Sequence, residues 1–227
     1  MSCPNTPGCI ESNLLINNQT ETILSEQQYV DCMPNPDECG GTGGCQGATQ
    51  PLLFEYATQE PNYPIASDDY VYTAHDGLCT EASKTAAASV AGFGILPENC
   101  ADEVLKAYLL QAGPIAVSVD ASHWSSYSKG VLSYASCGSD IDHAVLLVGY
   151  GTDPVYGDYW SIKNSWGVTW GEAGYIRISR EDGLATDYTP QDGVACAGAP
   201  PTSEVLGCGN HRGCTREPPF SAFGLAG

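Results

Sequence analysis

Asp142-His143-Ala144-Val145-Leu146-Leu147-Val148-Gly149-Tyr150-Gly151, followed by Lys163-Asn164-Ser165-Trp166-Gly167, is the part of the sequence that decides the fold. The unbroken apolar run at residues 145–148 predicts a buried strand. Trp160, Ile162 and Asn164 share one face of the next predicted strand. Two neighbouring strands of this kind can present the His143 imidazole beside the Asn164 carboxamide. A Cys-His-Asn catalytic site uses these two groups together with a thiol.

The composition predicts a folded chain that avoids nucleic acid and membranes. Its 227 residues include 27 acidic and 8 basic side chains, and the formal net charge of -19 repels nucleic acid and anionic lipid surfaces. With 42% hydrophobic and only 15% charged residues, the chain can bury a core. No apolar run approaches the roughly 20 residues that a membrane helix needs. We expect a monomer with neither nucleic acid nor a membrane as partner.

Cysteine usage indicates an oxidising compartment. The eleven cysteines show no repeated CxxC spacing, which favours disulfides over a cytosolic metal site, and the odd count leaves at least one thiol unpaired. The cluster between Cys208 and Cys214 could be a metal clip, but disulfide bonding or disorder is the stronger interpretation. We therefore predict no metal and no cofactor. Residues 1–8 lack a basic n-region and an apolar h-region, so no signal peptide is expected in this chain, and we expect an exporting segment upstream of it.

The first half of the sequence predicts helices joined by loops. Residues 10–16 fit part of a buried helix, which Pro4, Pro7 and Gly8 should keep from extending back to Met1. Ser25 and Gln28 form a capping-box pattern for a short helix that runs to about Asp31. Residues 33–47 predict an irregular loop pinned by Cys39 and Cys45, residues 48–60 a third helix, and residues 61–76 another loop.

The second half predicts one helix and then strands. Asn99 can cap a helix whose apolar face holds Ala101, Val104, Leu105 and Tyr108 and which Gly113 and Pro114 end. Residues 115–119 alternate as a half-buried strand does, and Ile176 and Ile178 share a face of a later strand. We place the change of character near residues 93–97, between two lobes of one unit.

Four motifs, in the same order along the chain, resemble those of the papain-like cysteine proteases. They are Leu24-Ser25-Glu26-Gln27-Gln28-Tyr29-Val30-Asp31-Cys32, Gly44-Cys45-Gln46-Gly47, Asp142-His143-Ala144-Val145, and Lys163-Asn164-Ser165-Trp166-Gly167 with its continuation to Tyr175. The resemblance implies an α+β, two-lobed fold that is incomplete at its N-terminus. Residues 1–96 would form a helical left lobe with a truncated first helix, and residues 97–227 an antiparallel β-barrel-like right lobe, poorly matched from about residue 197. A peptide-binding cleft would lie between the lobes.

The resemblance also implies roles for the two motif residues of the opening stretch. It makes His143 the general base and Asn164 the residue that orients it. Alone, a histidine beside an apolar strand is more often a core residue and an asparagine a turn residue, but the joint motif favours the catalytic interpretation. The remaining histidines, His75, His123 and His211, match no family position, and we expect them on the surface.

Further motif residues are implied to bind substrate. Trp166 would shield the His-Asn hydrogen bond from water and Trp170 would line the primed side of the cleft, although either indole could equally serve core packing. Gly44 and Gly47 belong to a loop whose backbone pairs with extended substrate, and Ala48 replaces the usual second glycine. Ser118 and Ile141 would line the main specificity pocket, which suggests a preference for an apolar side chain two positions before the cut.

The family's nucleophile has no counterpart at the matching position. Counting back nine residues from Ile10 reaches Met1, whose thioether has no proton to lose. The oxyanion-hole glutamine and the cysteine that would pair with Cys45 match positions upstream of the chain. Cys9 lies about two helical turns from the required place and Cys3 lies in a proline-rich segment, so we expect neither to substitute. Pairing with Cys39 or Cys45, or a free thiol, is the better interpretation for them.

The resemblance implies two disulfides. One joins Cys32 and Cys79. The other uses Cys137, with Cys196, Cys208 or Cys214 as its partner.

Two hypotheses follow. In the first, the chain is an incomplete cysteine-type peptidase that acts on peptides or proteins through a thiol acyl-enzyme and is inactive as given. In the second, it is a non-catalytic, peptide-binding or regulatory pseudo-protease. The resemblance implies that the full-length form is lysosomal, vacuolar or secreted.

Overall fold

A helical half and a sheet half make up the structure, a computed structural model that describes residues 6–96, 101–180, 184–188, 190–199, 202–206 and 209–210. The helices are α1 (Pro7–Asn18), α2 (Glu26–Cys32), α3 (Gln50–Ala57) and α4 (Asp102–Ala112). The strands are β1 (Ile115–Val119), β2 (Val131–Leu132), β3 (His143–Asp153), β4 (Gly157–Lys163), β5 (Tyr175–Ser179), β6 (Leu184–Asp187), β7 (Thr202–Leu206) and β8 (Gly209–Asn210). None of the helices found in these ranges is long and apolar enough to cross a membrane.

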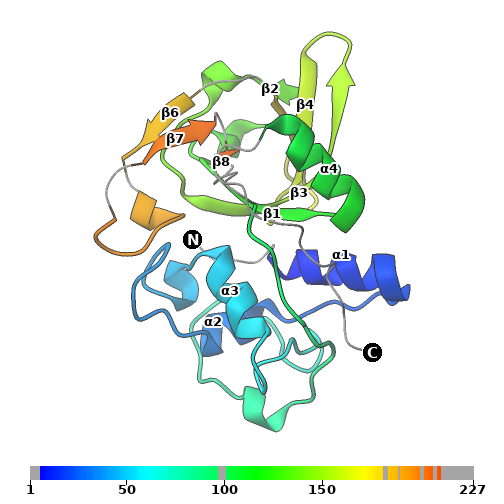
Figure 1. Cartoon of the computed structure of the whole chain (residues 1–227), viewed down its shortest axis with the longest axis vertical. Helices are drawn as coiled ribbons and strands as arrows, with labels where there is room; N and C mark the ends of the chain where they lie inside the picture. The colour runs from blue at the N-terminus through cyan, green and yellow to red at the C-terminus, as the bar shows by residue number, and fades with distance from the viewer. Residues whose placement is uncertain are drawn as a thin grey trace.

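The helical half packs α1, α2 and α3 around its own apolar core. Figure 1 shows these three helices together on one side of the molecule, with the strands and α4 on the other. Ile10 and Leu14 of α1, Tyr29 of α2 and Leu53 of α3 belong to one cluster of buried side chains. Leu53 has no exposed surface. The apolar residues predicted to face inward from residues 10–16 therefore do so at positions 10 and 14, whereas Leu15 and Ile16 are more than half exposed.

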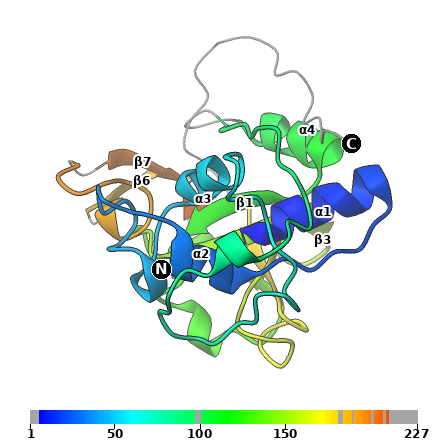
Figure 2. The same cartoon turned by 90° about the horizontal axis from the view of Figure 1, so that it is seen from below.

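The sheet half is built on a sheet with strand order β2-β5-β4-β3-β1-β8-β7-β6. Its neighbouring strands run antiparallel except for β2 and β5, which pair in parallel. The core on this sheet includes Leu105 of α4, Val145 and Leu147 of β3, and Ile162 of β4. Because α4 lies beside β3, this half covers its sheet with its own helix (Figures 1 and 2).

The two core clusters are separate in sequence as well as in space. The helical cluster spans residues 10–90 and the sheet cluster spans residues 105–178. This arrangement gives the α+β fold that the sequence predicts. The proposed lobe limits at residues 96 and 97 stay a prediction.

Two helix starts differ in detail from the sequence prediction. The prediction places Pro7 and Gly8 before the first helix, whereas α1 begins at Pro7 and both residues lie in its first turn, where the missing N–H of proline leaves no bond unmade. The Ser25 hydroxyl caps α2 by accepting the Gln28 N–H at 3.0 Å, as predicted. The Gln28 side chain does not complete the capping box, because its amide oxygen accepts the Ile65 N–H at 2.9 Å instead. The prediction that Asn99 caps the fourth helix is wrong, because α4 begins at Asp102 with Ala101 at the N-cap position.

The halves are joined by a disulfide between Cys39 and Cys196, 157 residues apart. Backbone hydrogen bonds flank it, from Gly40 N to the Ala195 carbonyl at 2.9 Å and from Ala197 N to the Asp37 carbonyl at 3.0 Å. This pairing corrects the prediction that Cys196 could be the partner of Cys137.

The other cysteines follow the predictions only in part. Cys32 and Cys79, the pair implied by the family resemblance, form a disulfide within the helical half. Cys137 is also disulfide-bonded. Cys45 is free, so only Cys39 of the two predicted anchors pins the loop at residues 33–47. Cys3, Cys208 and Cys214 lie outside the described residues.

Candidate active site

His143 and Asn164 meet because of strand register. In the antiparallel pairing of β3 with β4, Leu146 lies opposite Lys163, which places Asn164 opposite Val145. His143 is two residues before Val145 in β3, so its side chain points to the same face of the sheet as that of Val145. The His143 Nε2 atom lies 2.8 Å from the Asn164 Oδ1 atom.

The hydrogen bonds fix the tautomer of the ring. An amide oxygen can only accept a hydrogen bond, so Nε2 carries the ring proton and donates the hydrogen bond. Nδ1 of the neutral ring is left with a free lone pair. The Ser165 N–H donates to the same Asn164 oxygen at 2.8 Å, which fixes the orientation of the amide. The Asn164 nitrogen is buried and has no partner among the described residues. The arrangement leaves Nδ1 available to take a proton from an incoming group.

Two indoles contact the imidazole, and a third packs against both of them. The Trp166 ring centroid lies 5.4 Å from that of His143, and the Trp124 ring meets His143 edge-on at 6.1 Å. Trp170 stacks on Trp124 at 6.1 Å and donates its Nε1 hydrogen to the Trp124 carbonyl at 3.2 Å. Trp124 has no exposed surface, whereas Trp166 is 40% exposed. The aromatic cover of His143 therefore has a buried side, formed by Trp124, and an outer side, formed by Trp166, that solvent or a ligand can reach.

This cover changes the acidity of His143. Burial lowers the pKa of His143 below its ordinary value, while the Asn164 hydrogen bond and the Asp142 carboxylate act in the opposite direction. The neutral, proton-accepting form is thereby favoured, which suits a general base.

Two free thiols lie within the described part of the chain, and neither is placed against His143. The Cys9 thiol hydrogen-bonds the backbone of Ala116, and burial raises its pKa to about 12. Ala116 pairs with Leu146, three residues from His143 along β3, a separation of about 10 Å at the rise of a strand. Cys45 lies in the helical half, where burial and the nearby Asp76 carboxylate raise its pKa. Both environments disfavour the thiolate that a nucleophile needs.

The predicted substrate loop forms a tight turn. Gly44 begins a short 3-10 helix, and Gly47 both donates its N–H to the Gly44 carbonyl at 3.1 Å and accepts from Gly43 N at 2.8 Å. A Cβ atom at Gly44 would lie 2.0 Å from the Asp76 carboxylate, which would have to move, and the φ of +55° lies in the left-handed region that favours glycine. Ala48 is buried. The backbone of Gly47 is thus already engaged within the turn.

Ser118 and Ile141, predicted to line a specificity pocket, are both buried. Ile141 has no exposed surface, and Gly193 packs against its carbonyl so closely that a Cβ atom would lie 2.2 Å from it. The Ser118 hydroxyl contacts both side-chain amide atoms of Gln50 at the start of α3. Their pocket role stays a prediction.

The remaining candidates fall away from the site. His75 is exposed and contacts the Thr73 carbonyl, and His123 is exposed and contacts the Ser122 hydroxyl, while His211 lies outside the described residues. Cys32, Cys79 and Glu81 are the group of metal-ligand types that the described residues bring together. Because both cysteines are in a disulfide, they offer a metal no thiolate.

Comparison with known proteins identifies the family. Residues 4–192 match the family described as papain family cysteine protease. The chain belongs to this family. A "Cathepsin L-like" protein of Caenorhabditis elegans is 44% identical over 161 residues, which cover 69% of this chain and 46% of that protein. Mouse "Procathepsin L" is 37% identical over 189 residues, which cover 79% of this chain and 54% of that protein. The papain-family chain therefore spans about half the length of the curated relatives it matches.

The papain-family fold is equally clear in solved structures. The bromelain protease from Ananas comosus, in complex with the E64 inhibitor, superposes with a TM-score of 0.70 at 33% identity, covering 79% of this chain and 80% of that one. A Carica candamarcensis cysteine protease, also in complex with E-64, gives a TM-score of 0.69 at 30% identity over 86% of this chain and 83% of that one.

Sequence reasoning missed several residues that shape the site. Trp124 follows the predicted strand at residues 115–119, but nothing in its local pattern places it against His143. Gln50 reads as an ordinary residue of a predicted helix. Glu172 and Arg177 carry opposite charges five positions apart. The predicted strand at Ile176 and Ile178 says nothing about their side chains, so it does not predict their ion pair.

Proposed function

We propose that this chain carries the general base and the orienting amide of a thiol-dependent peptidase, His143 and Asn164, and that it acts on peptides or proteins. The observation that carries the proposal is the 2.8 Å contact between His143 Nε2 and Asn164 Oδ1, with Trp166 packed on the imidazole. In the family reaction, a thiolate attacks a peptide carbonyl and forms a thioester acyl-enzyme, which water then hydrolyses. His143 Nδ1 takes the thiol proton and later gives one to the leaving amine.

We also propose that these 227 residues are inactive by themselves. Met1 stands at the position that the family's nucleophile matches. Cys9 does not replace it, because its thiol is held at Ala116 with a pKa raised to about 12. Cys45 does not replace it either, because it lies in the helical half beside Asp76. No free thiol of the described residues is then placed to attack a substrate at His143.

We assign the substrate contacts as proposals from the family motif. Trp170 and the exposed face of Trp166 would contact the substrate on the primed side. The loop from Gly44 to Gly47 would lie along the extended peptide. Ser118 and Ile141 would select an apolar side chain two positions before the cut, which requires the segment around Gly193 to leave room beside Ile141.

A second candidate, a non-catalytic peptide-binding protein, is favoured by one observation. Both free thiols in the described residues have a raised pKa, the opposite of what a cysteine nucleophile requires. In this case the cleft would bind a peptide without cleaving it.

We further propose that the protein folds and works as a monomer in an oxidising compartment, as a lysosomal, vacuolar or secreted protein. The disulfides Cys32–Cys79 and Cys39–Cys196 support the oxidising compartment, since such bonds persist where the cytosolic reducing systems are absent.

The test compares three preparations on a fluorogenic peptide with an apolar residue two positions before the cleaved bond. They are the 227-residue chain, its His143→Ala variant, and the chain after alkylation by iodoacetamide. We expect no cleavage by any of them. Cleavage by the chain that both treatments abolish would overturn the proposed inactivity.

The two candidates are separated by the upstream transcript. If it encodes an in-frame thiol-bearing segment, the extended chain should cleave the peptide and lose this activity on His143→Ala substitution. If no such segment exists, and the chain binds the peptide by fluorescence anisotropy, the peptidase candidate fails and the binding candidate stands.

A further inference from the structure

The segment that carries Trp166 and Trp170 is a closed loop, residues 165–174, which we call the indole loop. It follows Asn164, the first residue after β4, and enters β5 at Tyr175. Asn164 N donates to the Gly174 carbonyl at 2.9 Å and so closes the loop at its base. Inside it, Gly174 N donates to the Trp170 carbonyl at 2.8 Å. These bonds set the shape of the loop, and the Trp170 Nε1 hydrogen, donated to the Trp124 carbonyl at 3.2 Å, attaches it to the rest of the sheet half at one point.

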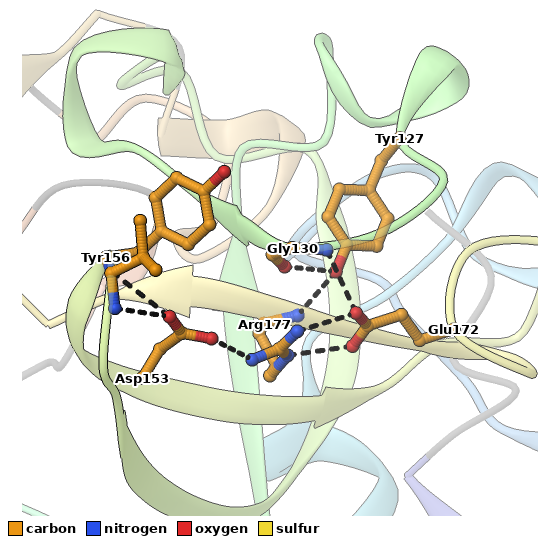
Figure 3. A network of polar contacts seen from close by, with 7 residues as sticks. Tyr127, Gly130, Asp153, Tyr156, Glu172 and Arg177 are labelled. Atoms are coloured by element: carbon orange, nitrogen blue, oxygen red, sulfur yellow. Dashed lines mark hydrogen bonds and ion pairs between the residues drawn. The ribbon is translucent and has the colours of Figure 1, made fainter.

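The Glu172 side chain makes a second attachment. Its carboxylate accepts two parallel bonds from Arg177, at 2.8 Å from Nε and 2.8 Å from Nη2, and a third from the Gly130 N–H at 2.9 Å (Figure 3). Bidentate pairing of this kind is the strongest geometry available to a carboxylate and an arginine. Glu172 therefore ties the indole loop to β5 through Arg177 and to the segment before β2 through Gly130.

Arg177 is itself held from two other directions. It donates from Nη1 to Asp153 at 2.9 Å, and its backbone N–H donates to the Tyr127 hydroxyl at 3.2 Å (Figure 3). The Tyr127 hydroxyl in turn donates to the Gly130 carbonyl at 2.6 Å. The Arg177, Glu172 and Asp153 side chains are 24%, 28% and 16% exposed, so water screens them only in part. Arg177 is thus a fixed point for the loop.

The attachment continues to His143 through ring contacts. The Tyr127 ring lies 5.6 Å from Trp170, Trp170 lies 5.1 Å from Trp166, and Trp166 lies 5.4 Å from His143. A loop released at Glu172 would keep the bond from Trp170 to the Trp124 carbonyl but lose the hold two residues further on, so the Trp166 indole could move away from the imidazole.

We propose that Glu172 is a positioning residue, whose bonds to Arg177 and Gly130 hold the indole loop on His143 and so keep water from the imidazole. The proposal builds on the proposed function, in which His143 is the base. The contacts themselves do not involve a thiol, so they can be tested whether or not the chain cleaves peptides.

Two effects of a Glu172→Gln substitution on His143 have opposite signs. Removing a negative charge disfavours the imidazolium and lowers the pKa of His143. Releasing the loop admits water to a ring whose pKa is lowered chiefly by burial, and so raises that pKa. Asp142, the charged neighbour of His143 in the described residues, is unchanged. A rise can therefore come only from the loop.

Asp153→Asn is the matched control. It removes the same charge from the same arginine, and the asparagine oxygen can still accept the Val155 and Tyr156 N–H groups that Asp153 accepts. Asp153 lies at the end of β3 and makes no hydrogen bond to the indole loop. Its loss should leave the Glu172 attachment in place.

The experiment is an NMR titration of the His143 ring, assigned with a His143→Gln variant, in the wild type, Glu172→Gln, Glu172→Asp and Asp153→Asn proteins. We expect Glu172→Gln to raise the pKa of His143 by about 0.5 or more, Glu172→Asp to raise it less, and Asp153→Asn not to raise it. An unchanged or lowered pKa in Glu172→Gln would overturn the proposal, and so would an equal rise in Asp153→Asn. If Glu172→Gln does not fold, the comparison of Glu172→Asp with Asp153→Asn decides in the same way. Failure of the peptidase assay would leave this result untouched.

Discussion

Gln50, the first residue of α3, and Ser118 of β1 hydrogen-bond through buried side chains although 68 residues separate them. Gln50 Nε2 donates to Ser118 Oγ at 2.8 Å, and Ser118 Oγ lies 3.1 Å from Gln50 Oε1. Both residues are less than a tenth exposed. This contact and the Cys39–Cys196 disulfide are two places where the helical half is fixed to the sheet half that carries His143.

The Gln50–Ser118 contact should show strong coupling. Ser118→Ala leaves a buried amide without a partner and should lower the free energy of unfolding by about 1–3 kcal/mol. Adding Gln50→Leu to it should cost little more, because no polar group is then left unpaired. Urea unfolding of the two single variants and the double variant measures the coupling, expected between about 0.5 and 3 kcal/mol. Simple additivity would show that the halves are not held together here.

Trp124 should contribute through packing alone. Its side chain is fully buried, and its Nε1 has no hydrogen-bond partner among the described residues. Trp124→Ala should lower the free energy of unfolding by about 3–5 kcal/mol, and Trp124→Phe by clearly less, because no hydrogen bond is lost and most of the ring volume stays. Equal losses in the two variants, measured by chemical denaturation, would contradict this account.

The two disulfides should contribute differently to the free energy of unfolding, because they close chain segments of different length. The intervals are 47 residues for Cys32–Cys79 and 157 for Cys39–Cys196. In the chain-entropy model they are worth roughly 4 and 5 kcal/mol. Paired serine substitutions, compared in guanidinium unfolding, should therefore destabilise the protein more at Cys39 and Cys196. The reverse order would show that native-state contacts, and not loop closure, dominate.

Stability should fall between weakly acidic and neutral pH because of Glu26. Burial, together with the Glu11 carboxylate, raises the pKa of Glu26 from 4.5 to about 7, although Lys163 acts against this. A folded pKa above the unfolded one means that the stabilisation is complete below about pH 4.5 and is lost as the pH rises through 7. Glu26→Gln should flatten this part of the stability profile in urea titrations, whereas Glu21→Gln, at an exposed position, should not. A profile unchanged by Glu26→Gln would refute the assignment.

The sequence contained enough to find the His143–Asn164 pair. An apolar run and an alternating strand define which side chains share a face, and two adjacent strands then bring a histidine and an asparagine together. The Ser25 cap can also be predicted from neighbouring residues, because a hydroxyl three residues before a free N–H can accept its hydrogen bond. Period and spacing place each side chain on its face or cap position, whereas the joint role of His143 and Asn164 is implied by the family resemblance.

The residues that support the pair could not be found in this way. Trp124 reaches His143 only through the path of the chain between β1 and β3, and Glu172 reaches Gly130 across 42 residues. The pairing of Cys39 with Cys196 is one of many that eleven cysteines allow, and no spacing rule selects it. Pro7 is predicted to lie before the first helix because a proline is unfavourable inside a helix. At the first turn this cost vanishes, so the outcome depended on where the helix begins.

The most direct test of the central claim is the tautomer of His143, read from the ¹⁵N shifts of its ring at a pH where the imidazole is neutral. We predict the proton on Nε2 and a free lone pair on Nδ1, with a mixture of the two tautomers in Asn164→Ala. A proton found on Nδ1 in the wild-type protein, or a tautomer unchanged by Asn164→Ala, would contradict the claim that Asn164 orients His143 as a general base.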